Sequence, residues 1–187
     1  MRTFATARFG VLSVNEEDVL RFPKGIPGFY EHREWALAGE DDNPVKWLQS
    51  LSDGAIALPV MPPQAVLPDY NARIVSGDLE ELAVEDPGGL SILVVVSIPP
   101  DAPWNMTANL RAPIVVNVAK RLAKQVICSN EEYGLRAFVL SDAMRASFEA
   151  QARLSAEEAA RAAGPAGAFG EEHGAGSRTT PTGEENF

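Results

Sequence analysis

One apolar run decides how this chain folds, and it reads Leu90-Ser91-Ile92-Leu93-Val94-Val95-Val96-Ser97-Ile98. Its residues are largely β-branched and are apolar on both faces of an extended chain, which is typical of a strand buried on both sides. Pro99-Pro100 ends the run, because a strand ladder needs the N–H that proline lacks. The sequence therefore predicts that residues 90–98 form the central strand of a β-rich core.

Shorter apolar segments lie on both sides of this run, and turn-forming residues separate them. Asp53-Gly54 stands between two such segments and predicts a hairpin. The connections are too short for the crossovers that parallel strands need. About ten short strands, roughly 8–12 residues apart, predict a mostly β protein: a small antiparallel barrel-like fold with short helical turns. The expected strands are two within 3–14, then 35–38, 45–51, 55–60, 72–75 and 90–98, two within 106–118, and 125–128; the clearest helical turn is 77–82.

A second informative stretch reads Phe22-Pro23-Lys24-Gly25-Ile26-Pro27-Gly28-Phe29. Proline keeps a strand or helix from running through it, and glycine allows sharp turns at positions 25 and 28. The result is a stiff frame that carries Phe22, Ile26 and Phe29. Such a frame either fills a core or offers an apolar surface to a partner, and it contains no nucleophile, general base or metal ligand.

The composition changes at Ser141. Residues 141–163 are rich in alanine and lack glycine and proline, and Gly164-Pro165 follow, so we expect a C-terminal helix. Met144, Phe148 and Leu154 form a loose apolar stripe that could pack on the barrel and shield a partner surface. The expected division is a β-barrel domain over 1–140, a helical extension over 141–163 and a disordered tail over 164–187.

Charge and cysteine content limit the partners and the compartment. The chain of 187 residues has a net charge of −10, which argues against direct binding of nucleic acid and favours either a basic protein partner or solubility alone. A single cysteine, Cys128, fits a reducing compartment. There is no apolar leader, and residues 92–96 are far too short to cross a bilayer, so we expect a cytoplasmic protein without membrane contact.

No pattern for chemistry emerges from the sequence. His32, His173 and Cys128 lack the spacing of metal ligands, and no glycine-rich phosphate loop is present. We therefore expect no catalytic residue, no metal and no cofactor, and the protein should not be an enzyme. Three amides in apolar surroundings, Gln49, Asn109 and Asn117, either bond to the backbone or face a partner.

Several segments, in this order and spacing, resemble the family of the flagellar assembly factor FliW. They cover roughly Phe4 to Tyr133. The segments that carry the resemblance are Phe9-Gly10, Phe22–Phe29, Trp47-Leu48-Gln49-Ser50, Pro68-Asp69-Tyr70, Met106–Asn117 and Lys124-Gln125-Val126-Ile127.

The resemblance implies a small, mostly antiparallel β-barrel-like fold without catalysis or a cofactor. It also implies a protein that binds CsrA, the translational regulator that binds messenger RNA, and antagonises it non-competitively, relieving repression of flagellin translation. It further implies binding of flagellin, as a chaperone in flagellum biogenesis. If this holds, we expect contact or contact-supporting roles for Phe22, Ile26, Pro27, Phe29, Asn109 and Leu110.

Two other functions stay open. A small-ligand-binding or enzymatic β-barrel would show a deep pocket with convergent polar groups at the barrel mouth. An interaction protein would instead show an apolar-rimmed surface around residues 22–29 and 104–113. A nucleic-acid-binding barrel is opposed by the net charge of −10.

Overall fold

The structure, a computed structural model, describes residues 1–163, and the tail expected to be disordered lies outside them. Short strands dominate this part of the chain, as the sequence predicts. The strands are β1 Arg2–Thr6, β2 Gly10–Val14, β3 Val19–Arg21, β4 Glu34–Ala38, β5 Lys46–Ser50, β6 Ala57–Met61, β7 Leu90–Ser97, β8 Thr107–Ala108, β9 Ile114–Asn117, β10 Leu122–Gln125 and β11 Ala137–Phe138. Short 3₁₀ turns cover Glu16–Asp18, Pro63–Ala65, Ser76–Leu82, Pro87–Gly89 and Pro103–Asn105, and one α-helix, α1, spans Asp142–Ala163.

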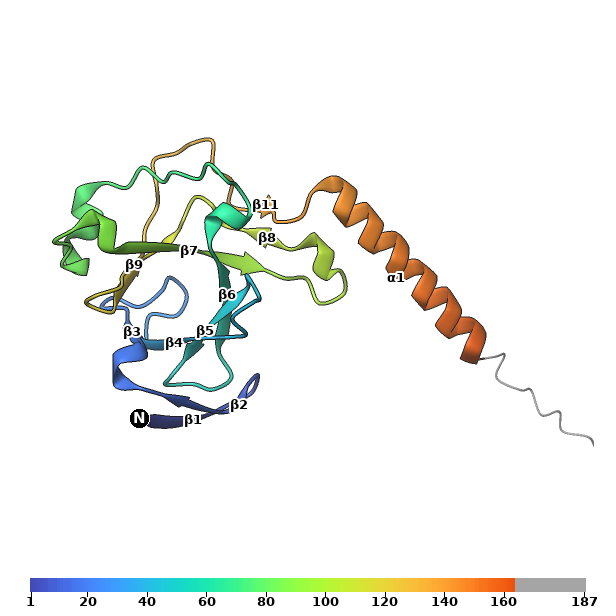
Figure 1. Ribbon diagram of the computed structural model, residues 1–187, viewed down its shortest axis with the longest axis horizontal. Coiled ribbons are helices and arrows are strands. Elements are labelled where there is room, and N and C mark those ends of the chain that lie inside the picture. The colour runs from blue at the N-terminus through green and yellow to red at the C-terminus, as the bar shows by residue number, and fades with distance from the viewer. Residues whose placement is uncertain (164–187) are drawn as a thin grey trace, which may run out of the picture. The chain divides into compact units, whose positions relative to one another are not determined.

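Seven of these strands close into a barrel (Figure 1). They follow the order β7-β6-β5-β4-β3-β10-β9, and β9 then pairs with β7 over Leu90↔Asn117 to Leu93↔Ile114. Every neighbouring pair in the ring is antiparallel except β3 and β10, which run parallel and meet at the single pair Leu122↔Arg21. The expected mostly β, barrel-like fold with a C-terminal helix is thereby confirmed.

Strand β7 is the central strand that the apolar run predicts. It pairs with β6, β8 and β9, more strands than any other strand of the described residues. Its side chains contribute to two core clusters, with Leu93 in one and Val94 and Val96 in the other. A strand packed on both faces has no room for the usual alternation with polar residues, which explains the continuous apolar sequence.

Two smaller units extend the barrel. Strands β8 and β11 continue the sheet outward from β7, and β1 pairs with β2 in a separate two-stranded hairpin. The hairpin covers part of the barrel through Phe4, Leu12 and Val14, which pack with Val19 and Ala36. Strands β1 and β2 are the two strands expected within residues 3–14, and Gly10, which has a φ of 63°, turns the chain between them.

The strand expectations fail at four places, and the first is β3, Val19–Arg21, which is not among the expected strands. Residues 72–75 form no strand, because Arg73 N–H donates to the side chain of Asn130 at 2.6 Å rather than to a neighbouring strand. The last barrel strand is Leu122–Gln125, three residues before the expected 125–128, since the β9–β10 turn needs only residues 118–121. Strand β11 is missed because two residues carry no periodic pattern.

Helix α1 begins immediately after Ser141, whose hydroxyl accepts a hydrogen bond from Met144 N–H at 3.3 Å. Near its start, the Arg145 guanidinium lies 3.7 Å from the centre of the Phe138 ring and reaches Asn105. The chain divides into two compact units after Ala150, within this helix. The expected domain boundaries at 140 and 163 stay a prediction.

Candidate protein-binding groove

The proline–glycine stretch folds into a tight loop between β3 and β4. Gly25 and Gly28 both adopt positive φ, 73° and 88°, which glycine alone reaches without strain. Hydrogen bonds close two small turns, from Gly25 N–H to Phe22 O at 3.0 Å and from Phe29 N–H to Ile26 O at 2.7 Å. The expected turns at positions 25 and 28 are therefore present, and the loop is fastened along its length.

Half of the expected contact residues lie in the core. Phe22 is 0 %, Ile26 2 % and Leu110 5 % exposed, which favours the contact-supporting role over direct contact, and the role of these three residues in partner binding stays a prediction. Phe22 meets Trp35 edge-on, with 6.2 Å between ring centres. Large apolar side chains gain most from full removal from water, so these three support the surface from below.

The other three residues meet at one groove. Pro27 is exposed, Phe29 and Asn109 are half-buried, and all three line an open hollow of about 340 Å³. Loop 22–29 and the segment after β8 lie far apart in the sequence, yet the structure brings them together as the sequence analysis expects. The remaining lining comes from Ile26, Leu58, Val95, Ser97, Thr107, Gln125, Leu135 and Arg136.

Asn109 is fixed in the groove by the backbone. Its N–H donates to Val95 O at 2.9 Å, and its Oδ1 accepts from Ala112 N–H at 3.0 Å. Gln125 Nε2 donates to Ala112 O at 2.9 Å from the neighbouring strand. Within residues 1–163 the Nδ2 of Asn109 makes no hydrogen bond, so the groove retains an oriented donor. The side-chain oxygen of Asn109 therefore bonds to the backbone, which is one of the two roles expected for this amide.

Leu135 and Arg136 at the rim were not among the contact residues expected from the sequence, nor were five lining residues on the barrel strands and β8: Leu58, Val95, Ser97, Thr107 and Gln125. Leu135 is 64 % exposed at the rim, and Arg136 follows it. Leu135 is a single large apolar residue between the largely polar segment Ser129–Gly134 and Arg136. An isolated leucine in such a segment is the signal that could have identified it as a surface residue.

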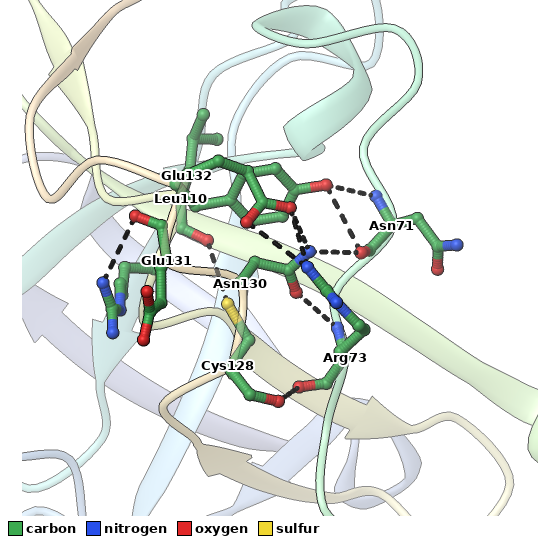
Figure 2. A network of polar contacts seen from close by, with 10 residues as sticks. Asn71, Arg73, Leu110, Cys128, Asn130, Glu131 and Glu132 are labelled. Atoms are coloured by element: carbon green, nitrogen blue, oxygen red, sulfur yellow. Dashed lines mark hydrogen bonds and ion pairs between the residues drawn. The ribbon is translucent and has the colours of Figure 1, made fainter.

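A polar network holds the segment that leads to Leu135 (Figure 2). Asn130 Nδ2 donates to Asn71 O at 3.2 Å, and Asn71 N–H donates to Tyr133 Oη at 2.8 Å. The Arg73 guanidinium pairs with Glu132 at 3.1 Å, and the pKa of the Glu132 carboxyl is lowered by bonds from Asn130 and Arg73. These contacts join residues 71–73 to 130–133 and fix the rim of the groove.

Tyr70 anchors the opposite side of this network. Its hydroxyl donates to Leu110 O at 2.9 Å, beside Asn109, and its ring stacks on Tyr133 with 4.8 Å between centres. Burial, together with the nearby Cys128 and Tyr133, raises the pKa of the Tyr70 phenol above its ordinary value. The neutral phenol is therefore the form that the fold requires.

One carboxylate connects the loop to the barrel. Glu81 Oε1 lies 2.6 Å from Lys24 Nζ and 3.2 Å from Lys124 Nζ. These bonds, led by the one from Lys24, lower the pKa of Glu81. Lys24 belongs to the loop and Lys124 to β10, so the two contacts tie the loop to this barrel strand through Glu81.

The described residues show no arrangement for metal binding and no helix suited to a membrane. No group of three or more His, Cys, Asp and Glu side chains within residues 1–163 is placed to hold a metal ion. Across the same residues, no helix is both long and apolar enough to cross a bilayer. Gln49 and Asn117 are turned inward, donating to Ile56 O and Leu82 O at 2.9 Å, so the backbone role expected for both amides is confirmed.

The family model described as "FliW protein" matches residues 3–139, which include the barrel and every residue of the groove. The chain belongs to the FliW family. A flagellar assembly factor FliW from Thermotoga maritima is 41% identical over 130 residues, covering 69% of this chain and 87% of that protein. Another from Thermotoga petrophila is 40% identical over 141 residues, covering 75% and 94%.

A solved structure supports the same assignment. The crystal structure of a flagellar assembly factor FliW superposes with a TM-score of 0.69 and 33% sequence identity, covering 75% of this chain and 99% of that one. The FliW family match ends at residue 139, just before α1, so the helix is an addition to the matched region. None of the described groove-lining residues comes from α1.

Proposed function

We propose that this FliW-family protein is a cytoplasmic flagellar assembly factor that works by binding proteins rather than by catalysis. It binds the translational regulator CsrA, antagonises it non-competitively and so relieves repression of flagellin translation. It also binds flagellin as a chaperone, and export of flagellin frees the protein to act on CsrA.

The groove is the observation that carries this proposal. It is open, its lining mixes apolar with uncharged polar side chains and one arginine, it is rimmed by Pro27, Phe29 and Leu135, and it contains the fixed amide of Asn109. An interface core of this composition, with few charges, is typical of protein recognition. A small-ligand-binding or enzymatic barrel would need a deep pocket with convergent polar groups. The groove is open instead.

Charge supports the choice of partner. The net charge of −10 accelerates the encounter with a protein whose RNA-binding surface is basic. Direct competition with RNA would require carboxylates at the centre of the contact surface, whereas the named lining of the groove contains Arg136 and no acidic residue. A contact outside the RNA site, coupled to it energetically, fits this lining better.

Calorimetric titration of CsrA into the full chain tests the groove. Leu135→Asp places a carboxylate at the rim without disturbing the core and should weaken CsrA binding by about tenfold or more. Val75→Asp is the matched control, because Val75 is 59 % exposed and lies outside the groove. Equal affinity of Leu135→Asp and the unsubstituted protein, with equal melting temperatures, would remove the groove from the proposal.

RNA binding by CsrA tests the mode of antagonism. With increasing FliW-family protein, the apparent RNA affinity of CsrA should fall to a plateau, because a coupled site changes affinity by a fixed factor. A fall that continues without limit would indicate direct competition. Flagellin added to the preformed complex should release CsrA, and a stable ternary complex would contradict the exchange of partners.

A further inference from the structure

A second surface, remote in sequence from the groove residues, lies along strand β2. Within residues 1–163, β2 pairs with β1 alone, whereas the barrel strands are paired on both sides by closure. The other edge of β1 is covered near its end, because Gly54 approaches it so closely that a Cβ there would lie 2.0 Å from Ala5 O, and Ala7 N–H bonds to Gly54 O at 2.9 Å. Along β2, by contrast, no backbone segment of the described residues covers the outer edge, which leaves its outward main-chain groups unpaired.

An apolar trough follows this open edge. Leu12 and Val14 of β2 line a hollow of about 440 Å³ together with Ala36, Leu37 and Leu93. Leu12 and Leu37 also line a second hollow of about 680 Å³, which contains Phe9, Val45 and Trp47. The two hollows share Leu12 and Leu37, and the side chains that line them together define the trough beside β2.

Acidic residues stand at both ends of the trough. Glu17 and Asp18 follow β2 at one end, and Glu40-Asp41-Asp42 follow β4 at the other. Three cationic side chains lie among them. Arg121 approaches Asp18 at 3.7 Å, Arg8 stacks over Trp47 at 3.5 Å from the ring centre, and Lys46 Nζ donates to Glu40 O. Among the described residues the carboxylates of Glu17, Glu40 and Asp41–Asp42 form no ion pair, so the ends keep an excess of negative charge.

We propose that the β2 edge receives an extended segment of a partner protein, which adds to the hairpin as a third strand. Main-chain hydrogen bonds to β2 would supply affinity, and every second side chain of the segment would enter the trough. Charge complementarity requires lysine or arginine at the two ends of that segment. A second copy of this chain is a poorer occupant, because two molecules of net charge −10 repel each other.

The probe is a capped peptide of about ten residues that alternates valine and lysine, with a valine–glutamate peptide as its charge control. Amide hydrogen exchange of the full chain, followed by NMR, should show new protection at Gly10–Val14 with the lysine peptide alone. Leu37→Asp should weaken that binding by about tenfold or more, because Leu37 lines both hollows. Val75→Asp should leave the affinity unchanged, since Val75 lies outside the trough.

Three outcomes would overturn the proposal. One is absence of protection at β2, or protection at other segments, while the peptide binds. The second is that the protein binds both peptides with equal affinity, or that Leu37→Asp and Val75→Asp bind the lysine peptide with equal affinity, while melting temperatures show that all the proteins are folded. The third is a dimer, in sedimentation of the protein alone, that Leu37→Asp dissociates, which would assign the edge to a second copy. None of these results depends on CsrA binding at the groove.

Discussion

Gly25 and Gly28 share a backbone conformation that would strain any other residue, but they differ in what surrounds them. Both have positive φ, yet a Cβ at Gly25 would lie 2.6 Å from Tyr30 O, whereas a Cβ at Gly28 would meet no atom within 4 Å. Gly25 is therefore required twice, for its dihedral angle and for the close approach of the backbone. Substitutions at the two glycines therefore distinguish the cost of a strained φ alone, at Gly28, from that cost plus a steric clash, at Gly25.

We expect Gly25→Ala to lower the free energy of unfolding by about 2–4 kcal/mol, since the backbone of residue 30 must move in addition to the strain of positive φ. Gly28→Ala should cost only about 1 kcal/mol, from the left-handed conformation alone. Urea denaturation of both variants measures the difference. Equal costs would mean that the loop accommodates the Cβ at position 25 without resistance.

Tyr70 makes stability dependent on alkaline pH. The phenol has a raised pKa in the folded protein, so above about pH 10 the unfolded chain loses this proton first and stability falls as pH rises. Tyr70→Phe should flatten that fall and, at neutral pH, cost about 1 kcal/mol through the lost bond to Leu110 O. Tyr30→Phe, at an exposed position, should keep the alkaline fall, and urea unfolding at neutral and alkaline pH compares them.

The barrel strands are joined unequally. Strand β7 is paired along its whole length, with β9 at Leu90–Leu93, β6 at Val94–Val95 and β8 at Val96–Ser97, whereas β3 and β10 meet at a single parallel pair. Beside that pair, Arg21 N–H donates to Arg121 O at 2.8 Å. Few hydrogen bonds resist separation there, so the β3–β10 seam is the weakest line of the ring.

Native-state hydrogen exchange should resolve this seam. We expect the Arg21 amide to exchange through an opening that costs about 1–3 kcal/mol less than the opening that exposes the protected amides of β7. Equal opening free energies for Arg21 and β7 would show that the barrel unfolds only as one unit.

The elements that sequence predicts well are those with a local cause. The run at 90–98 and the turn at Asp53-Gly54 carry their signal in neighbouring residues, and both are confirmed. Residues 72–75 resemble a strand, but the side chain of Asn130 takes the bond that a strand would need, and nothing local in the sequence shows that. Boundaries such as the start of β10 depend on the partner strand, which lies elsewhere in the chain.

The groove was predictable in part. The proline–glycine loop and the segment around Asn109 were identified from sequence, and both line it. Phe22, Ile26 and Leu110 could not be assigned to surface or core from residue type, because the same apolar side chains serve both. The decision rests on which way each side chain faces, and that is set by the closed barrel as a whole.

At the scale of the whole molecule, the FliW family model covers the barrel and ends at residue 139, before α1. Since α1 contributes no described residue to the groove, removal of residues 141–187 should leave CsrA affinity within about twofold. Calorimetry and thermal unfolding of the truncated and full chains test this. A large change in affinity at an unchanged melting temperature would instead support the expectation that the helix shields the partner surface.

The closure of β7 on β9 constrains how the barrel is made on the ribosome. Strands β3 to β7 are synthesised in order, but β7 can pair with β9, and β3 with β10, only after those later strands have been made. The ring therefore cannot close before residue 125 emerges. At about 5–20 residues per second, β7 stays open for roughly 1–6 seconds and β3 for roughly 5–20 seconds. Because the chain continues for a further stretch after β10, the barrel can be complete while its C-terminal residues are still being translated.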